Sequence, residues 1–164
     1  MATPRFGAWL DDRGAHFRLW TPGTSRVDLL IEGRDPLPLT RGDRGVFAAD
    51  LPALPGGTRY RYRLDGAREA IPDPASGWQP DGVHGASALD DARAFAWQAA
   101  PVPLDARELI IYELHVGTFT PEGTFDAARD KLPYLRELGI TAIELMPVAE
   151  FAGARNSFCA TLHL

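Results

Sequence analysis

The chain has 164 residues, of which 45% are hydrophobic and 24% charged, the balance of a soluble globular protein rather than of a disordered one. Its 22 Asp and Glu residues outnumber its 17 Lys and Arg residues, and a net charge of -5 argues against a general nucleic-acid binder. The single cysteine excludes an intramolecular disulfide and a cysteine-rich zinc site, and no apolar run approaches the roughly 20 residues of a membrane span.

The opening residues carry no apolar stretch of secretory length, so we expect a cytoplasmic protein with neither a membrane nor a nucleic-acid partner. Phosphate-binding and dinucleotide-binding motifs are also missing, so no cofactor is implied. The histidines show no spacing typical of zinc ligands, and we therefore predict no metal site. They are His16, His84, His115 and His163.

The first hundred residues read as short segments of alternating character that end at turns. Segments 15–20, 26–32, 46–51 and 59–64 are predicted strands. In the last of these, three arginines alternate with Tyr60, Tyr62 and Leu64. We expect the arginines to face solvent over a core of tyrosines; the alternative is a face for a polar ligand. Strands at this spacing favour an antiparallel β-sandwich.

Residues 71–82 hold too many prolines for a strand or a helix, so they predict an ordered loop, packed by Trp78. Residues 99–103 resemble a linker. The sequence therefore predicts two domains, a sandwich module over 1–98 and a second unit over 99–164.

The pattern changes after Leu104. Leu109–Leu114 is a nearly continuous apolar run, typical of a parallel strand that is covered on both faces. Thr124 is a candidate helix cap, and the apolar spacing that follows predicts a helix to residue 138, split or kinked at Pro133 and ended by Gly139. A second strand over 140–146 completes a right-handed βαβ unit.

Several of these segments resemble one known family. Residues 109–119 resemble the first barrel strand of the α-amylase superfamily, glycoside hydrolase family 13, and residues 139–151 resemble its second strand and the following loop. Residues 6–9, 17–22 and 73–85 are similar to the family's N-terminal module and its link to the barrel. The resemblance implies an immunoglobulin-like β-sandwich of the early-set type, followed by an incomplete (β/α)8 barrel start.

Within that family, residues 120–125 favour the branch that releases trehalose by hydrolysing the α-1,4 bond next to the trehalosyl end of maltooligosyltrehalose. The resemblance thus implies an α-glucan substrate for the full-length enzyme. The alternative is an α-glucan-binding or packing module of a branching or debranching enzyme of the same family. Stand-alone glucan binding would weaken on replacing Trp9 or Trp78.

The resemblance also implies that the catalytic carboxylates lie on later barrel strands, so we assign no catalytic residue and expect the chain alone to be inactive. Residues 104–164 are far fewer than the roughly 250 of a complete barrel. The family pattern stops after Asn156, which we interpret as a truncation by frameshift, premature stop or fragmentation. Glu113 and Glu144 lie inside strands, and nothing in the sequence forces them to the separation of about 5–5.5 Å of a retaining pair.

Two residues remain weak candidates for substrate binding. His115 follows the first predicted barrel strand and Glu150 follows the second, on the side where barrel sites form. A structural hydrogen bond and a loop carboxylate are the respective alternatives. The tryptophans are expected to be buried anchors, with sugar stacking as the alternative. They are Trp9, Trp20, Trp78 and Trp97.

Overall fold

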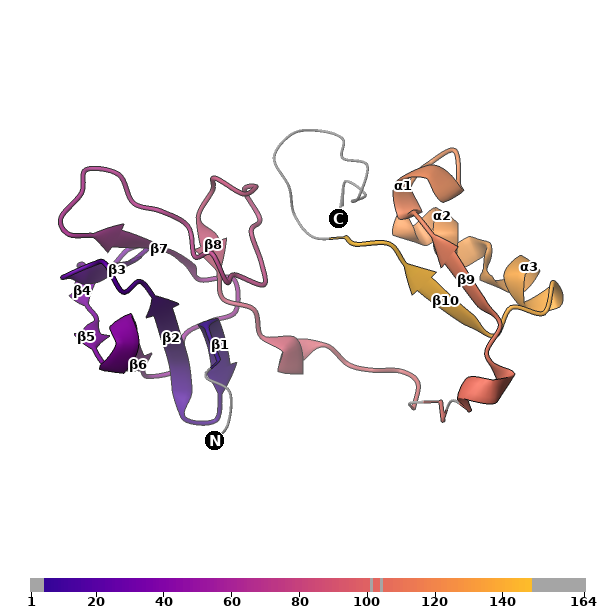
Figure 1. Cartoon of the computed structure of the whole chain (residues 1–164), viewed down its shortest axis with the longest axis horizontal. Coiled ribbons are helices and arrows are strands. Elements are labelled where there is room, and N and C mark those ends of the chain that lie inside the picture. Colours follow the sequence, from indigo (N-terminus) through magenta and orange to yellow (C-terminus); the bar gives the residue numbers. More distant parts are fainter. Residues whose placement is uncertain (1–4, 101, 104, 149–164) are drawn as a thin grey trace. The chain divides into compact units, whose positions relative to one another are not determined.

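The computed structural model describes residues 5–100, 102–103 and 105–148. The chain divides into two compact units, Met1–Ala96 and Trp97–Leu164 (Figure 1). Among the helices in these described ranges, none has the length and apolar character needed to cross a bilayer.

The first unit consists of two four-stranded sheets in which every pairing is antiparallel (Figure 1). In spatial order, one sheet contains β1 (Gly7–Asp11), β2 (Gly14–Trp20), β6 (Val46–Leu51) and β5 (Thr40–Arg41). The other contains β4 (Leu37–Pro38), β3 (Val27–Ile31), β7 (Arg59–Leu64) and β8 (Ser87–Ala88). Two 3-10 helices, Asp43–Gly45 and Ala92–Ala94, complete the unit.

The core of this unit lies between the two sheets and is rich in aromatic rings. Phe17 of β2 meets Tyr60 of β7 edge to face, with ring centroids 5.1 Å apart, and Tyr60 meets Tyr62 at 5.8 Å. All three side chains are buried. The four predicted strands and the inward tyrosines are thereby confirmed. Strand β1 was not predicted, because its five residues are defined by their register with β2, such as Trp9 opposite His16, rather than by an alternating pattern.

The prediction that the tryptophans anchor the core is wrong. Trp20 is 59% exposed, Trp78 40% and Trp97 83%. The cause for Trp20 is register: Ala15, Phe17 and Leu19 point inward, so the alternation of β2 turns Trp20 outward. Phenylalanine and tyrosine rings fill the space between the sheets instead.

The proline-rich loop is held by Asp73 rather than by Trp78. Asp73 is 1% exposed, and its Oδ2 accepts hydrogen bonds from the hydroxyls of Tyr60 at 2.8 Å and Tyr62 at 3.4 Å. The backbone N–H of Asp73, near the start of the loop, donates to Ser87 Oγ at 2.9 Å. Burial raises the pKa of the Asp73 carboxyl. The loop is therefore tied directly to the aromatic core.

In the second unit, β9 (Ile111–Leu114) pairs in parallel with β10 (Ala142–Leu145) (Figure 1). The connection contains α1 (Val116–Phe119), α2 (Phe125–Asp130) and α3 (Leu132–Glu137), preceded by a 3-10 helix at Ala106–Glu108. The parallel pairing of β9 with β10, with helices in the connection, confirms the βαβ arrangement predicted from the sequence. Its buried cluster is small and consists of Leu114, Val116 and Leu135.

The helix signals in the second unit act as predicted. Thr124 Oγ1 accepts a hydrogen bond from the Ala127 N–H at the start of α2. Pro133 falls in the first turn of α3, where its missing N–H costs nothing, and the helical segment is split into α2 and α3 as predicted. Gly139 ends α3 with φ +95°. Helix α1 was not predicted, because four residues are too short to show a helical period.

The turn between β1 and β2 depends on Gly14. This residue has φ +140°, and an added Cβ would overlap the carbonyl oxygen of Leu51. Gly66 also has a positive φ, +71°, but open space surrounds it. We predict that Gly14→Ala lowers the free energy of unfolding by more than about 2 kcal/mol, and Gly66→Ala by about 1 kcal/mol. Urea denaturation followed by tryptophan fluorescence measures both; equal losses would contradict the steric explanation.

Candidate functional site

The two strands of the second unit place two carboxylates side by side. Glu113 of β9 is the register partner of Glu144 of β10, and both side chains are exposed. On the opposite face, Leu114, Ile143 and Leu145 line an apolar groove beside α2, together with Phe125 and Leu132. Parallel strands in register place the two glutamates next to each other on one face, with about 4.8 Å between the strands.

His115 lies directly after β9, at the N-terminal end of α1. Its carbonyl oxygen accepts the N–H groups of Thr118 and Phe119, both at 3.0 Å. Its side-chain Nδ1 is buried and has no hydrogen-bond partner among the described residues. The structural hydrogen bond expected as the alternative role of this side chain is thus not made within those residues. The other candidate, Glu150, lies outside the described residues.

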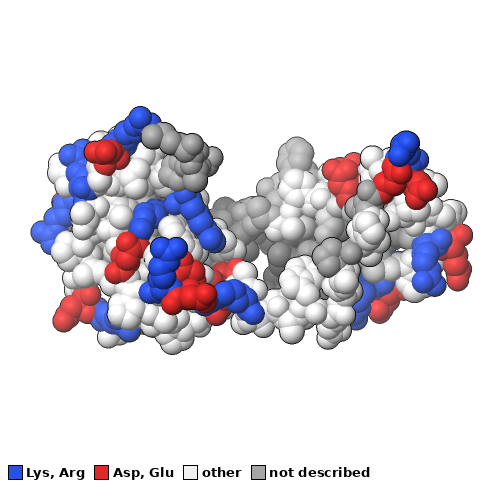
Figure 2. All heavy atoms as spheres, turned by 90° about the horizontal axis from the view of Figure 1, so that it is seen from below, with Lys and Arg blue, Asp and Glu red and all other residues white. Residues whose placement is uncertain are grey.

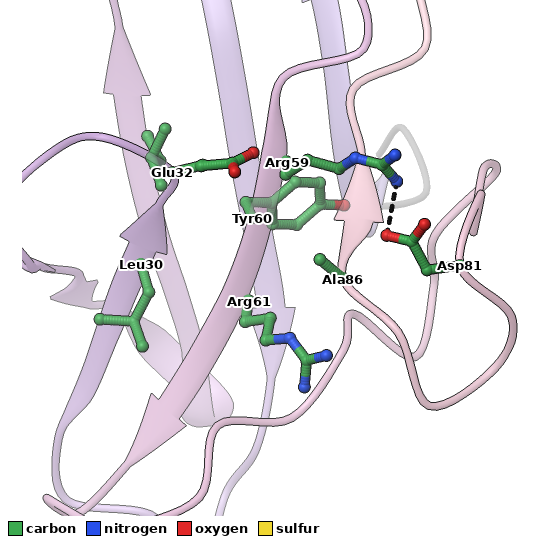
Figure 3. Close-up of a pocket in the computed structure, with 8 residues that line it drawn as sticks. Leu30, Glu32, Arg59, Tyr60, Arg61, Asp81 and Ala86 are labelled. Atoms are coloured by element: carbon green, nitrogen blue, oxygen red, sulfur yellow. Dashed lines mark ion pairs between the residues drawn. The ribbon is translucent and has the colours of Figure 1, made fainter.

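A cavity of about 430 Å³ lies on the outer face of the second sheet of the sandwich. Figure 3 shows its wall: side chains from the end of β3, the start of β7 and the loop before β8 surround it. Arg59 Nη1 lies 2.9 Å from Asp81 Oδ2 across this space. Arg61 donates to the carbonyl oxygens of Ala70 at 3.2 Å and His84 at 3.1 Å. These contacts connect β7 to the loop.

The third arginine of β7, Arg63, is also paired. Its Nη2 donates to Oδ2 of the buried Asp28 carboxylate at 3.1 Å. The other oxygen of that carboxylate, Oδ1, accepts a hydrogen bond from Arg26 Nε at 3.0 Å. Burial raises the pKa of Asp28, but the hydrogen bonds from Arg26 and Arg63 outweigh it, and the net shift is downward. The three arginines are therefore half-buried and paired with loops and a buried carboxylate, rather than facing solvent as expected.

The pocket in Figure 3 has the polar groups of a binding site but no exposed aromatic ring, since Tyr60 is its one aromatic wall residue among those described and is buried. Basic and acidic side chains are interspersed over the face drawn in Figure 2. This mixed surface suits an uncharged ligand better than a polyanion. Within the described ranges, no group of three or more His, Cys, Asp and Glu side chains could hold a metal ion.

The outer face of the other sheet carries a histidine between two carboxylates. His16 Nδ1 lies 2.6 Å from Asp50 Oδ1, and His16 Nε2 lies 2.9 Å from Asp11 Oδ1. Two carboxylate neighbours favour the imidazolium, in which both nitrogens donate. The hydrogen bonds to Asp50 and Asp11 raise the pKa of His16 and lower the pKa of each carboxylate.

Trp9 stacks on this histidine with ring centroids 5.0 Å apart. The guanidinium groups of Arg5 and Arg18 lie 4.9 Å and 5.5 Å from the Trp9 ring centre. With an imidazole and two guanidinium groups around it, Trp9 has little free ring surface for a ligand. The four tryptophans thus differ in exposure and in ring contacts, and the sequence alone could not distinguish them.

Comparison with known proteins shows which proteins this chain is similar to. Residues 5–79 match carbohydrate-binding module 48, the isoamylase N-terminal domain. Over 94% of the chain, the fold superposes on 26% of a Salmonella typhimurium protein described as an alpha amylase, with TM-score 0.84 and 38% identity. It also superposes on 24% of pullulanase SAP of group B Streptococcus in complex with maltotetraose, with TM-score 0.69, 26% identity and 90% of this chain covered. The chain is thus similar to a carbohydrate-binding module and to parts of an alpha amylase and a pullulanase.

One group among these enzymes is favoured by sequence. The chain is 46% identical to the malto-oligosyltrehalose trehalohydrolase of Saccharolobus solfataricus over 152 residues, or 92% of its own length. The match covers 27% of that protein, so the chain spans about a quarter of the length of the curated relative. The resemblance to trehalohydrolases seen in the sequence motifs is confirmed.

The histidine cluster predicts how stability depends on pH. Because the folded-state pKa of His16 is raised above its value in the unfolded chain, folding binds a proton. This contribution is fully present below about pH 6.5 and is lost as pH rises through the raised pKa. We therefore expect the unfolding free energy to fall above about pH 6.5, measured by urea denaturation at several pH values.

His16→Gln is the matched control, because it keeps a polar side chain of similar length and removes the titration. The variant should lose this pH dependence, and its decline at low pH should also be smaller, because the hydrogen bonds to His16 are the main cause of the lowered pKa values of Asp11 and Asp50. An unchanged slope above pH 6.5 in His16→Gln would show that another group causes it.

Proposed function

We propose that this chain is the N-terminal portion of a malto-oligosyltrehalose trehalohydrolase. The parent enzyme hydrolyses the α-1,4 bond next to the trehalosyl end of maltooligosyltrehalose and releases trehalose in the cytoplasm. In this proposal residues 1–98 are the sandwich module, and residues 99–164 are the linker and the start of a (β/α)8 barrel. The 46% identity over 152 residues to a trehalohydrolase is the observation that carries it.

The second unit supports the barrel part of the proposal. A parallel strand pair connected through helices is the repeating unit of a (β/α)8 barrel, and a barrel strand carries side chains alternately to the interior and to the helices. In β9 and β10 the apolar groove lies beside α2, while Glu113 and Glu144 lie on the other face. That second face would line the interior of a complete barrel.

These two glutamates are not proposed as the catalytic pair. A retaining hydrolase needs a nucleophile on one side of the scissile bond and an acid/base that reaches the leaving oxygen. Neighbouring residues in register on adjacent strands present both carboxylates from the same side. We propose structural roles for them, and catalytic carboxylates on later strands. His115 and Glu150 remain proposed contacts to substrate in the whole enzyme.

The chain alone should therefore be inactive. We predict that the purified 164-residue protein releases no trehalose from maltooligosyltrehalose above the rate of a buffer control, because a positioned pair of carboxylates supplies most of the rate enhancement. Product analysis by anion-exchange chromatography measures this. Trehalose release that disappears in Glu113→Gln with Glu144→Gln would contradict our assignment and make this pair catalytic.

A chimera tests the parent activity. Replacing the matching segment of the Saccharolobus solfataricus trehalohydrolase with residues 5–148 of this chain should preserve trehalose release within about tenfold, because both the module and the strand pair are retained in a related framework. The unmodified relative is the positive control. A folded chimera that releases no trehalose would overturn the trehalohydrolase assignment.

The alternative is an α-glucan-binding or packing module of a branching or debranching enzyme. The match of residues 5–79 to a module also described for isoamylase favours this option. The same chimera separates the two: a branching or debranching role predicts loss of trehalose release with normal folding.

A further inference from the structure

Trp20 is an exposed ring held in a fixed orientation. It is 59% exposed, yet its Nε1–H donates to the carbonyl oxygen of Arg44 at 3.0 Å. Arg44 sits in a tight turn with φ +55°, and the adjoining Gly45 has φ +76°. The Gly45 carbonyl oxygen in turn accepts the Thr21 N–H at 2.8 Å. An indole fixed at its polar edge offers its apolar face to solvent with little rotational freedom to lose on binding.

Polar groups follow Trp20 along the same side of β2. Arg18 is two residues away and faces the same way. Its guanidinium has five N–H donors, and three of them bind Phe17 O, Ala49 O and Asp50 Oδ1. Among the described residues the other two have no partner. Asp50 adds an exposed carboxylate as acceptor, so the face combines an aromatic ring with fixed donors and acceptors.

A small cavity completes this face. It has a volume of about 190 Å³ and is lined by Phe6, Arg18, Trp20 and the loop residues Asp73 to Ala75, with Leu19 at its base. Phe6 is itself partly exposed. The cavity is much smaller than the range of about 300–1,000 Å³ typical of sites for drug-sized ligands, so it would admit a single ring rather than a folded ligand.

We propose that the outer face of β2 is an α-glucan-binding site, separate from the pocket on the other sheet. A glucose ring packs on Trp20 and enters the cavity beside Phe6, and its hydroxyl groups bind Arg18. The inference rests on the proposed function for its ligand class. Trp9 is covered by His16 and two arginines.

The test is a titration of the isotope-labelled 164-residue chain with maltopentaose, followed by NMR of the four indole N–H groups. The Trp20 resonance should shift with a Kd in the range of about 1–10 mM. Cellopentaose, its β-1,4-linked counterpart, should bind at least about fivefold more weakly. Its extended chain does not present its rings and hydroxyl groups to Trp20 and Arg18 in the same arrangement. No shift at Trp20 up to about 20 mM maltopentaose, or equal binding of cellopentaose, would overturn the proposal.

Variants locate the site. Trp20→Ala should weaken maltopentaose binding about tenfold, and Trp20→Phe should retain binding within about threefold because a ring remains. Trp97→Ala is the matched control for loss of an exposed tryptophan and should bind normally. Backbone amide spectra of the Trp20 variants establish that they are folded. Shifts confined to Arg59, Arg61 and Asp81 would overturn the proposal and place the sugar in the pocket of Figure 3.

Failure of the Trp20 site and failure of the trehalohydrolase assignment give different results. A chimera that releases trehalose, together with a chain that binds no maltopentaose, would reject the Trp20 site alone. A chain that binds at Trp20, together with an inactive folded chimera, would reject the trehalohydrolase assignment and leave the Trp20 site in place.

Discussion

The buried carboxylate of Asp73 connects the core of the sandwich to the two surface cavities described above. Its bonds to Tyr60 and Tyr62 reach into the aromatic core, while its backbone N–H bonds to Ser87. The loop between Asp73 and Ser87 supplies walls to the two cavities, on opposite sheets. A carboxylate in such surroundings is costly unless its oxygens are hydrogen-bonded, and burial raises its pKa. Two tyrosine hydroxyls offset that cost, so the position of the loop is linked to the packing of the core.

The two outer faces of the sandwich are built differently. On β7 the arginines bind loop carbonyls and carboxylates, so their charges serve mainly to hold the surrounding chain in place. On β2 an exposed ring stands next to an arginine with donors still available. For an uncharged, hydroxyl-rich ligand, a fixed apolar ring and adjacent donors are the more useful combination, because sugars offer both C–H faces and hydroxyl edges. This difference is the physical basis for placing a glucan on β2.

Among the described residues, the second unit has a smaller buried core than the first. Its buried cluster consists of Leu114, Val116 and Leu135, whereas Phe125, Ile143 and Leu145 remain partly exposed along the groove beside α2. A two-stranded parallel sheet buries little surface by itself, and parallel sheets are otherwise found covered on both faces. This small buried core agrees with the resemblance to an enzyme that is about four times as long.

The sequence by itself determined the elements with strong local signals. The alternation at Arg59–Leu64, the cap at Thr124, the helix division at Pro133 and the positive φ at Gly139 follow from side-chain period and backbone sterics, which act over a few residues. The family resemblance followed from the same local motifs. Only the tertiary structure decided what depends on partners far along the chain: the burial of Asp73, the pairing of Glu113 with Glu144, and which tryptophans are covered. These are properties of register and of long-range contacts; for the residues that lie in strands, such as Glu113, Glu144 and Trp20, a one-residue change of register would move the side chain to the opposite face.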